Sequence, residues 1–337
     1  MATISLVVPA AGCGARAGLN RNKVLVPLLN RPLLWWTLHA LCDASALAPG
    51  THVTQLIVAA RREEFAEIEA AIASPIPNAS SVVPGAVASS APSAAGAPLF
   101  SFFHPATSPS PRLSLHLVEG GNSRQQSVAN AVAVASGDFV LVHDAARPLV
   151  SPPLIERVLR AALRFDCAIA ALPVSDSVKI ASPQPHDSAS AQPHEPASAQ
   201  PHESASSEKT ASFPVPGDKG VGQARARSSD ALAMIAQTLD RSLVYLAQTP
   251  QVFRREILDE ALHQAARDGF AGTDCSSLVE RLRDANGRQR FPIALVAGDE
   301  RNFKITFAAD LERAATWLQD AKLQDARLQD SNHGTLA

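Results

Sequence analysis

Short runs rich in β-branched residues alternate with amphipathic segments along most of the chain, and this alternation constrains the fold more than any other feature. We expect strands at residues 4–9, 55–60, 113–118, 139–143, 168–174 and 293–297. We expect helices at residues 33–42, 63–72, 123–135, 153–165, 254–267, 276–282 and 308–318. The alternation predicts an α/β fold in which a mostly parallel, twisted sheet carries helices on both faces. Ligands of such sheets bind beyond the carboxyl ends of the strands, so residues that follow strands are the candidates for function.

Two segments lack the pattern of a folded core. Residues 74–112 are rich in Ala, Ser and Pro, and the prolines are too frequent for a helix or a paired strand. Residues 181–230 contain an octapeptide repeat whose copies begin with Gln-Pro-His at Gln184, Gln192 and Gln200. The repeated histidines have the chemistry of metal ligands, but duplication of a flexible linker explains them as well. We therefore expect a single domain over 1–318 with two low-complexity insertions, and a repetitive, frayed helical tail over 319–337.

Charge, hydropathy and cysteine spacing exclude several classes of protein. The formal net charge of the 337 residues is −2, which argues against a general nucleic-acid binder. The sequence has no apolar run near the roughly 20 residues of a membrane span, and its first residues lack the basic flank of a secretory signal. The 4 cysteines form no CxxC pair, so they favour neither a zinc site nor a disulfide framework. We expect a cytoplasmic protein that binds neither nucleic acid nor a membrane.

The first expected strand leads into a loop of small residues, Pro9-Ala-Ala-Gly-Cys-Gly-Ala-Arg-Ala-Gly18. Backbone N–H groups of such a loop can approach a phosphate closely. The loop also satisfies the dinucleotide fingerprint of dehydrogenases, with glycines at Gly12 and Gly14. That fingerprint requires a helix that begins inside the loop, whereas Pro27 and Pro32 occupy the span of that helix. The loop therefore predicts a nucleotide site and disfavours a dehydrogenase.

Two cations follow the first expected strand, and a carboxylate follows the fourth. Arg16 lies in the small-residue loop, and Lys23 comes seven residues later. Fixed cations beside a phosphate stabilise charge that is redistributed during phosphoryl or nucleotidyl transfer. Asp144 follows the strand at 139–143 and is suited to hold Mg²⁺, the usual partner of a nucleoside triphosphate. The alternatives are ordinary loop charges at Arg16 and Lys23 and a solvated turn aspartate at Asp144.

Further candidate residues follow the last expected strand or precede an expected helix. Lys304 follows the last expected strand, which places another cation on the ligand side. Thr273 or Asp274 precedes the helix at 276–282, and either residue type is favoured as an N-cap.

A set of short motifs then occurs in order along the chain. They are Ala10-Ala-Gly-Cys-Gly-Ala-Arg16, Lys23, Gly120-Gly-Asn-Ser-Arg-Gln-Gln-Ser-Val128, Val142-His-Asp-Ala-Ala-Arg-Pro148, Pro173-Val-Ser-Asp-Ser-Val-Lys179, Thr238-Leu-Asp-Arg241, Gln248-Thr-Pro-Gln-Val-Phe253, Thr273-Asp274 and Asn302-Phe-Lys-Ile-Thr306. This ordered set resembles the 2-C-methyl-D-erythritol 4-phosphate cytidylyltransferase family. The resemblance covers residues 4 to about 318 apart from the two insertions, and the segments 143–148 and 249–251 carry it best.

The resemblance implies a Rossmann-like nucleotidyltransferase fold and a specific reaction. CTP and 2-C-methyl-D-erythritol 4-phosphate would give 4-diphosphocytidyl-2-C-methyl-D-erythritol and pyrophosphate, a step of the non-mevalonate route to isoprenoids. It also implies Mg²⁺ or another divalent cation as the cofactor. The acceptor's own phosphate oxygen would be the nucleophile, so no covalent enzyme intermediate is needed.

The resemblance also implies a role for each matched residue. Those implied to carry the catalytic charges are Arg16, Lys23, Arg241 and Lys304. Those implied to bind the nucleotide are Ala10, Ala11, Gly12, Gly14, Gly121, Asn122 and Ser127. Those implied to bind the substrate are Asp144, Arg147, Ser177, Thr249 and Thr273, with Asp144 also implied to hold the metal ion.

In the resembling family the segment from Ser177 to Arg241 is a β-arm that hooks over a second subunit. A homodimer is therefore implied, in which Arg241 reaches the neighbour's site. Three positions depart from the family pattern: Asn122 stands where Asp is frequent, Ser177 where Thr is common, and Cys275 where an acidic residue is frequent. Each exchange keeps a polar or small group, so we expect altered affinity more than lost function.

Two other functions compete with this interpretation. A cytidylyltransferase for another polyol phosphate, such as ribitol 5-phosphate, would share the nucleotide half of the site. An inactive nucleotide-binding scaffold would act through its Pro-rich segments. The scaffold is disfavoured because it would need none of the charged residues Arg16, Lys23, Asp144, Arg241 and Lys304.

Overall fold

The computed structural model describes residues 1–12, 21–43, 48–73, 113–182 and 234–333. It divides into two compact units, a larger one formed by Met1–Leu172 with Tyr245–Ala337 and a smaller one formed by Pro173–Val244. The expected insertion at 74–112 and nearly all of the one at 181–230 lie outside the described residues, as does the loop segment 13–20.

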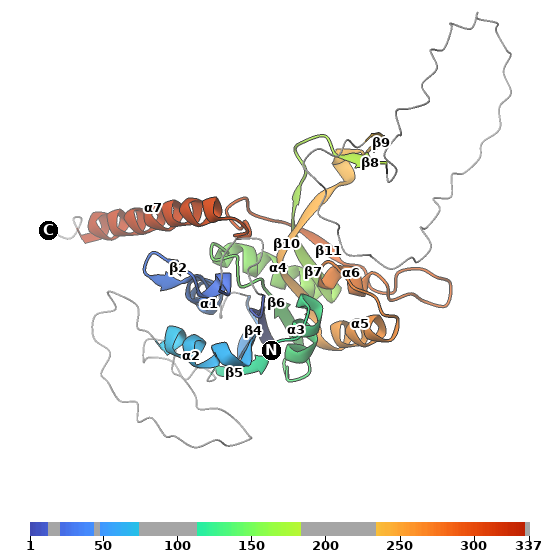
Figure 1. The fold of residues 1–337 in the computed structure, drawn as a ribbon, viewed down its shortest axis with the longest axis horizontal. Coiled ribbons are helices and arrows are strands. Elements are labelled where there is room, and N and C mark those ends of the chain that lie inside the picture. The colour runs from blue at the N-terminus through green and yellow to red at the C-terminus, as the bar shows by residue number, and fades with distance from the viewer. Residues whose placement is uncertain (13–20, 44–47, 74–112, 183–233, 334–337) are drawn as a thin grey trace, which may run out of the picture. The chain divides into compact units, whose positions relative to one another are not determined.

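A seven-stranded sheet forms the centre of the larger unit (Figure 1). Its spatial order is β11 (Ala294–Ala297), β7 (Cys167–Pro173), β10 (Tyr245–Arg254), β6 (Phe139–Val142), β1 (Ala2–Pro9), β4 (Thr51–Ala60) and β5 (Ser114–Glu119). β1 runs parallel to β4 and β6, β4 runs parallel to β5, and β11 runs parallel to β7. The prediction of a mostly parallel α/β sheet is therefore confirmed.

β10 is the strand of the seven-stranded sheet that the sequence pattern does not predict. It pairs antiparallel with β6, with Gln251 opposite Val142. Its sequence places polar residues and Pro250 in the middle of the strand, which argues against a central position in a sheet. Tertiary context overrides this preference, because Val252 and Phe253 are fully buried between the two helical layers.

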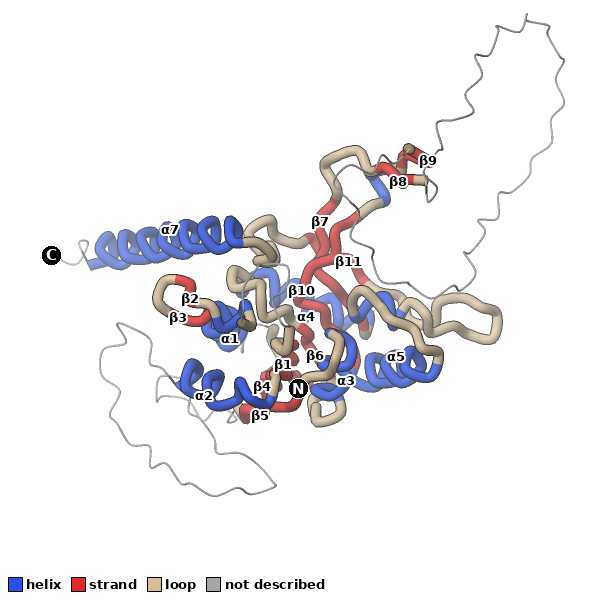
Figure 2. The backbone as a smooth tube through the Cα atoms, viewed as in Figure 1, coloured by secondary structure: helices blue, strands red, loops and turns tan. Residues whose placement is uncertain are grey.

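Helices cover both faces of the sheet, as expected (Figure 2). On one face α1 (Leu33–Asp43), α2 (Phe65–Ala73) and α4 (Pro152–Phe165) contribute to one apolar cluster. On the other face α3 (Arg124–Val132), α5 (Arg255–Arg267) and α6 (Cys275–Val279) contribute to a second cluster. Successive side chains of β1 point to opposite faces of the sheet, so this strand contributes to both clusters. Leu6 and Val8 belong to the first cluster and Val7 belongs to the second. Each such buried side chain contributes about 1.5–3 kcal/mol of hydrophobic stabilisation.

A third, smaller cluster fixes the C-terminal segment. It joins Leu28 and Leu33 to Ala146, Ile305 and Ala314. Its members include residues of the short strand β2 (Pro27–Leu28), of α1 and of α7 (Ala308–His333). In the sequence, β2 lies between η2 (Lys23–Leu25) and the short strand β3 (Arg31–Pro32). The backbone of α7 is helical to His333, so it includes most of the repetitive segment that we expect as a frayed helical tail. Among the described residues no helix is both long and apolar enough to cross a bilayer.

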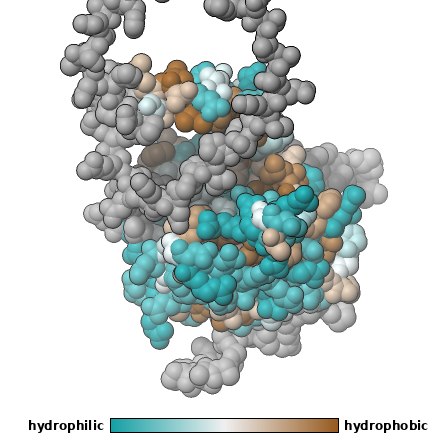
Figure 3. All heavy atoms as spheres, turned by 90° about the vertical axis from the view of Figure 1, so that its right-hand side faces the viewer, coloured by the Kyte–Doolittle hydropathy of each residue, from teal (hydrophilic) through white to brown (hydrophobic). Residues whose placement is uncertain are grey.

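The described residues of the smaller unit are exposed or only partly buried. It contains β8 (Lys179–Ala181), which pairs antiparallel with β9 (Ile235–Thr238), and the short helix η4 (Arg241–Leu243). Its apolar side chains are exposed, with Ile235 at 66% and Leu243 at 79%, and apolar patches are visible in brown at the top of Figure 3. Ile235 belongs to the segment that the resemblance assigns to a β-arm, and Leu243 follows that segment closely.

Candidate active site

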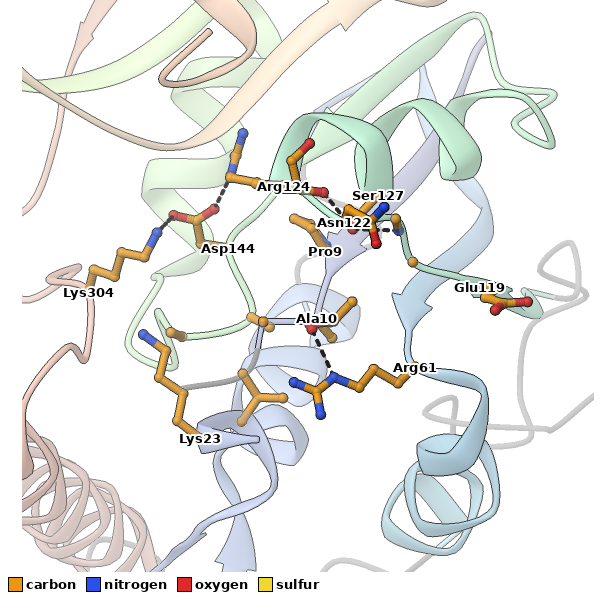
Figure 4. A pocket seen from close by; sticks show the side chains of 18 of the residues that line it. Pro9, Ala10, Lys23, Arg61, Glu119, Asn122, Arg124, Ser127, Asp144 and Lys304 are labelled. Carbon is orange, nitrogen blue, oxygen red and sulfur yellow. Dashed lines mark hydrogen bonds and ion pairs between the residues drawn. The ribbon is translucent and has the colours of Figure 1, made fainter. Parts of the chain in front are cut away.

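A cavity of about 960 Å³ opens where β1, β4, β5 and β6 end (Figure 4). Its walls come from the residues that follow each strand, including Ala10 after β1, Arg61 after β4, Gly120 after β5 and Asp144 shortly after β6. This position at the carboxyl edge of parallel strands is the one that the fold class predicts for a ligand site. The volume suits a ligand of nucleotide size.

Most of the residues proposed from the sequence meet in this cavity. Those that line it are Ala10, Ala11, Gly12, Lys23, Gly121, Asn122, Ser127, Asp144, Thr273 and Lys304. Gly14 and Arg16 lie outside the described residues. Six separate segments of the described chain therefore converge on one site, at the edge of the sheet where the strand-end rule places a ligand.

The loop between β5 and α3 narrows one side of the cavity. A Cβ atom at Gly120 would lie 2.3 Å from the Ala11 Cβ, so only glycine allows the loop to approach the first strand this closely. The Gly121 N–H donates to the Ser127 hydroxyl at 3.1 Å, and that hydroxyl donates to the Ser123 carbonyl at 2.9 Å. Ser123 also caps α3 by accepting from the Gln126 N–H. Small groups held in this way form a frame that suits a flat base.

Asp144 is the centre of charge in the site. Its carboxylate accepts from Arg124 Nε at 2.9 Å and from Lys304 Nζ at 2.9 Å, and Arg147 Nε lies 3.7 Å away. Burial alone would raise the pKa of Asp144, but Arg124 and Lys304, followed by Arg147, outweigh burial and hold the pKa well below its usual range. Asp144 is therefore ionised, and it holds Arg124 and Lys304 in fixed positions.

The segment around Ile305 connects the two lysines of the cavity. The Ile305 N–H donates to the Ala146 carbonyl at 2.9 Å, which fixes the chain beside the loop that carries Asp144. Lys23 Nζ donates to the Ile305 carbonyl at 2.8 Å. Lys304, the residue before Ile305, reaches Asp144 from the same segment. The third apolar cluster, which buries Ile305, thus positions both cations.

Two residues of the motifs that carry the resemblance lie behind the cavity wall. Thr249 is buried, and its hydroxyl accepts from the Asp144 N–H at 3.0 Å. Arg147 is buried too and donates from Nη1 to the Asn302 carbonyl at 2.6 Å. Neither residue lines the cavity, so both act on Asp144 in this structure. Their contact with a substrate stays a prediction.

His143 is a buried neutral side chain in the same motif. Its Nε2 donates to the Arg147 carbonyl at 3.1 Å. Burial lowers the pKa of His143 to about 4, because the charged form would lose its hydration. The residue therefore orders the loop after β6 and carries no charge at neutral pH.

Asp274 is the N-cap of α6, a role for which the sequence offered either Thr273 or Asp274. Its carboxylate accepts from the Ser277 N–H at 3.0 Å at the start of α6. Gln251 donates to the other carboxylate oxygen at 2.7 Å, so β10 holds this turn. Thr273, one residue earlier, is thereby placed in the cavity wall.

Arg124 belongs to the motif at residues 120–128, but the sequence assigned it no role in the site. Besides its bond to Asp144, its Nη1 lies 3.7 Å from the Cys275 sulfur. Burial raises the pKa of Cys275, so that side chain is a neutral thiol. A signal did exist in the sequence, because a cation in the first turn of a helix opposes the helix dipole and calls for a compensating anion. Here Asp144 is that anion.

Two predicted residues belong to the smaller unit. Ser177 and Arg241 are exposed there, and Arg241 Nη1 donates to the Ser175 carbonyl at 2.8 Å. Lys179 Nζ donates to the Thr238 hydroxyl at 2.8 Å across β8 and β9. The role in binding the acceptor that the resemblance implies for Ser177 and Arg241 stays a prediction.

The donors around the cavity restrict the kind of metal ion that it can hold. No group of three or more His, Cys, Asp or Glu side chains within the described ranges could hold a metal ion. Asp144 offers a single carboxylate, whose oxygens already face cations. Mg²⁺ commonly takes one or two carboxylates and completes its coordination with water and substrate phosphates. The donor set therefore fits a magnesium ion that arrives with a polyphosphate, and it does not fit a metal ion held by the protein alone.

Comparison with known proteins gives a consistent result. A family model described as 2-C-methyl-D-erythritol 4-phosphate cytidylyltransferase matches residues 4–88, 106–193 and 186–320. A curated protein of that name from Acidobacterium capsulatum is 30% identical over 324 residues, which cover 94% of this chain and 97% of the relative. A crystal structure of the Thermus thermophilus protein of the same name is 26% identical, with a TM-score of 0.52 over 94% of this chain and 99% of that chain.

A further solved structure supports the fold alone. It is titled a 4-diphosphocytidyl-2C-methyl-D-erythritol synthase from Anaerococcus prevotii, with 19% identity and a TM-score of 0.59 over 94% of this chain and 99% of that chain. The family match extends from the first strand to α7, and the relative from Acidobacterium aligns over almost its full length. The chain belongs to the 2-C-methyl-D-erythritol 4-phosphate cytidylyltransferase family.

Proposed function

We propose that this chain is a nucleotidyltransferase that transfers CMP from CTP to 2-C-methyl-D-erythritol 4-phosphate, a step of the non-mevalonate route to isoprenoids. The products are 4-diphosphocytidyl-2-C-methyl-D-erythritol and pyrophosphate. The observation that carries the proposal is a cavity at the strand ends that combines a frame of small residues with Lys23, Lys304 and Asp144, in a chain of this family.

Bond changes in the reaction need little from the protein besides position and charge. An oxygen of the acceptor phosphate attacks the α-phosphorus of CTP, a new P–O–P linkage forms, and the bond to the β-phosphate breaks so that pyrophosphate leaves. Lys23 is held at the cavity by the Ile305 carbonyl, from which it can stabilise charge on the α-phosphate. Arg16 would act with it. Because the attacking oxygen is already anionic, no general base is required.

The two sides of the cavity suit the two substrates. Gly121, Asn122 and Ser127 would frame the cytosine and favour it over a larger purine. Lys304 and Thr273 would contact the acceptor phosphate from the opposite side. Asp144 orients Lys304 in the absence of that phosphate, because its carboxylate accepts a hydrogen bond from Lys304 Nζ.

Magnesium enters this proposal as a partner of the triphosphate. Mg²⁺ would neutralise charge on the phosphate oxygens, and Asp144 would hold it in place of one of its cationic partners. Lys304 is the partner suited to exchange, because its side chain is 40% exposed whereas that of Arg124 is 27% exposed.

A homodimer is also part of the proposal. The exposed apolar residues of the smaller unit, such as Ile235 and Leu243, would be covered by a second copy of this chain. Arg241 would then contact the acceptor in the partner's site. A location in the cytoplasm stays a prediction of the sequence.

The direct test measures pyrophosphate release by the purified chain with CTP and Mg²⁺. We expect release with 2-C-methyl-D-erythritol 4-phosphate and none with ribitol 5-phosphate. Release with ribitol 5-phosphate alone would move the protein to another polyol-phosphate pathway. Release with neither acceptor, in a protein that still binds CTP, would favour the scaffold.

A further inference from the structure

Arg61 is a cation of the cavity to which neither the sequence analysis nor the proposed reaction gives a role. It directly follows β4, the strand between β1 and β5, so it leaves the sheet at the edge where the cavity opens. Its Nε donates to the Ala11 carbonyl at 3.3 Å, which ties the side chain to the start of the small-residue loop. In Figure 4 the guanidinium extends into the cavity on the side of Lys23 and away from Asn122 and Ser127.

The described lining of the cavity carries five cations against three carboxylates, those of Glu63, Glu119 and Asp144, and this excess of positive charge favours an anionic ligand. Asp144, the buried carboxylate of the cavity, compensates Arg124 and Lys304. Arg61 makes no ion pair with a carboxylate of the described part of the chain, and its terminal nitrogens donate no hydrogen bond to it. A guanidinium that is fixed through Nε keeps its two terminal N–H₂ groups available for a planar, two-point contact with phosphate oxygens.

We propose that Arg61 binds the polyphosphate of the nucleotide and, after the transfer, the pyrophosphate product. This inference rests on the proposed function. A phosphate is favoured over the cytosine as the ligand because the frame for the base lies at Gly121 and Ser127, whereas Arg61 is anchored at Ala11 beside the phosphate loop. Arg61 is thus a residue for nucleotide affinity and product release.

The binding test uses inorganic pyrophosphate and CTP, each with Mg²⁺, titrated into the full-length chain by calorimetry. We expect Arg61→Gln to weaken both ligands by about tenfold, because one charge-assisted contact is lost. Arg61→Lys keeps the charge but loses the two-point contact, so an intermediate affinity is expected. Arg160→Gln is the matched control, since Arg160 is an exposed arginine paired with Glu156 outside the cavity, and its affinities should equal those of the wild type.

A kinetic test separates this role from a general effect on the fold. Arg61→Gln should raise the KM for CTP by about tenfold while the KM for the acceptor changes less than about twofold. Unchanged affinity for pyrophosphate in Arg61→Gln overturns the inference, including the case in which only CTP binding weakens, because that pattern assigns Arg61 to the base or ribose.

The same data distinguish failure of the inference from failure of the proposed function. A wild type that binds CTP and pyrophosphate but transfers nothing to 2-C-methyl-D-erythritol 4-phosphate overturns the function and leaves the Arg61 comparison valid. A wild type that transfers CMP while Arg61→Gln binds pyrophosphate normally overturns the inference alone. A wild type that binds neither ligand overturns both.

Discussion

The cavity and the smaller unit hold their predicted functional residues in different ways. Asp144 in the cavity contacts Arg124 and Lys304 from two distant segments and Arg147 of its own loop. Lys23 is fixed by a backbone carbonyl that lies 282 residues away in the sequence. The side chain of Arg241 in the smaller unit is exposed, and within the described part of the chain it donates to the nearby Ser175 carbonyl. The charged groups of the cavity are therefore fixed within one copy of the chain, whereas the described side chains of the smaller unit are left largely exposed, as the proposed dimer would require.

The largest expected effect comes from removing a charge of the preorganised cavity. Lys23→Ala should lower kcat by roughly 10²- to 10³-fold, because one fixed cation no longer stabilises the transition state. Steady-state pyrophosphate release measures this. Arg21→Ala is the nearby control, since Arg21 pairs with Glu67 and does not line the cavity, and it should retain near-normal turnover. Near-normal turnover of Lys23→Ala would contradict the role of the cavity.

The next effect tests whether the smaller unit works across subunits. Arg241→Ala should lower kcat/KM for the acceptor by roughly 10²-fold while leaving CTP binding intact. Mixing this variant with Lys23→Ala should restore about a quarter of wild-type activity, since half of the randomly formed dimers are heterodimers and each contains one intact site. No restoration in mixtures of verified heterodimers would place Arg241 in the site of its own subunit.

A third prediction concerns the pH dependence of stability. It sharpens the contrast between the two units, because the buried residue that titrates, His143, belongs to the larger unit. The folded-state pKa of His143 is lowered to about 4, below the ordinary value near 6.5. The unfolded chain therefore binds more protons in this window, and stability falls as the pH falls from 6.5 to 4. The shift corresponds to about 3 kcal/mol of unfolding free energy. Asp144, whose pKa is also lowered, adds a loss in the same direction below pH 4.

Urea unfolding at pH 7, 5.5 and 4.5 measures this effect. His143→Gln removes the titrating group and should give a flatter dependence between pH 7 and 4.5 than the wild type. An exposed histidine provides the control, and His263→Gln should leave the profile unchanged because His263 has a 69% exposed side chain on α5. Equal slopes for the wild type and His143→Gln would show that His143 does not set the acid limit.

The smallest effect is expected from the low-complexity repeat. Deletion of residues 184–207 should leave the dimer and kcat nearly unchanged, because the repeat lacks residues that form a core. Light scattering and pyrophosphate release check the two parts. A monomeric deletion variant would mean that the repeat belongs to the structure of the arm.

Much of the fold could be predicted from local patterns. Strand β1 and helices α4 and α5 follow from apolar periodicity and have nearly the expected bounds. β10 could not be predicted, because Pro250 and its polar neighbours form a strand only when β6 lies beside them. The helix expected at 308–318 and the helical tail expected after it form one element, α7, whose end at His333 could not be predicted because the five-residue repeat gives no constant apolar face.

The site divides in the same way. The sequence by itself determined the α/β class, the motif order that identifies the family, and Asp144 and Lys304 as charges after strands, while phosphate binding by the small-residue loop stays its prediction. Only the tertiary structure decided that Asp144 holds Arg124 and Lys304, that Thr249 supports its backbone, and that Arg61 faces the cavity. Residue types and spacing are local properties of the chain, whereas the partner of a buried charge depends on which distant segments the packed core brings together.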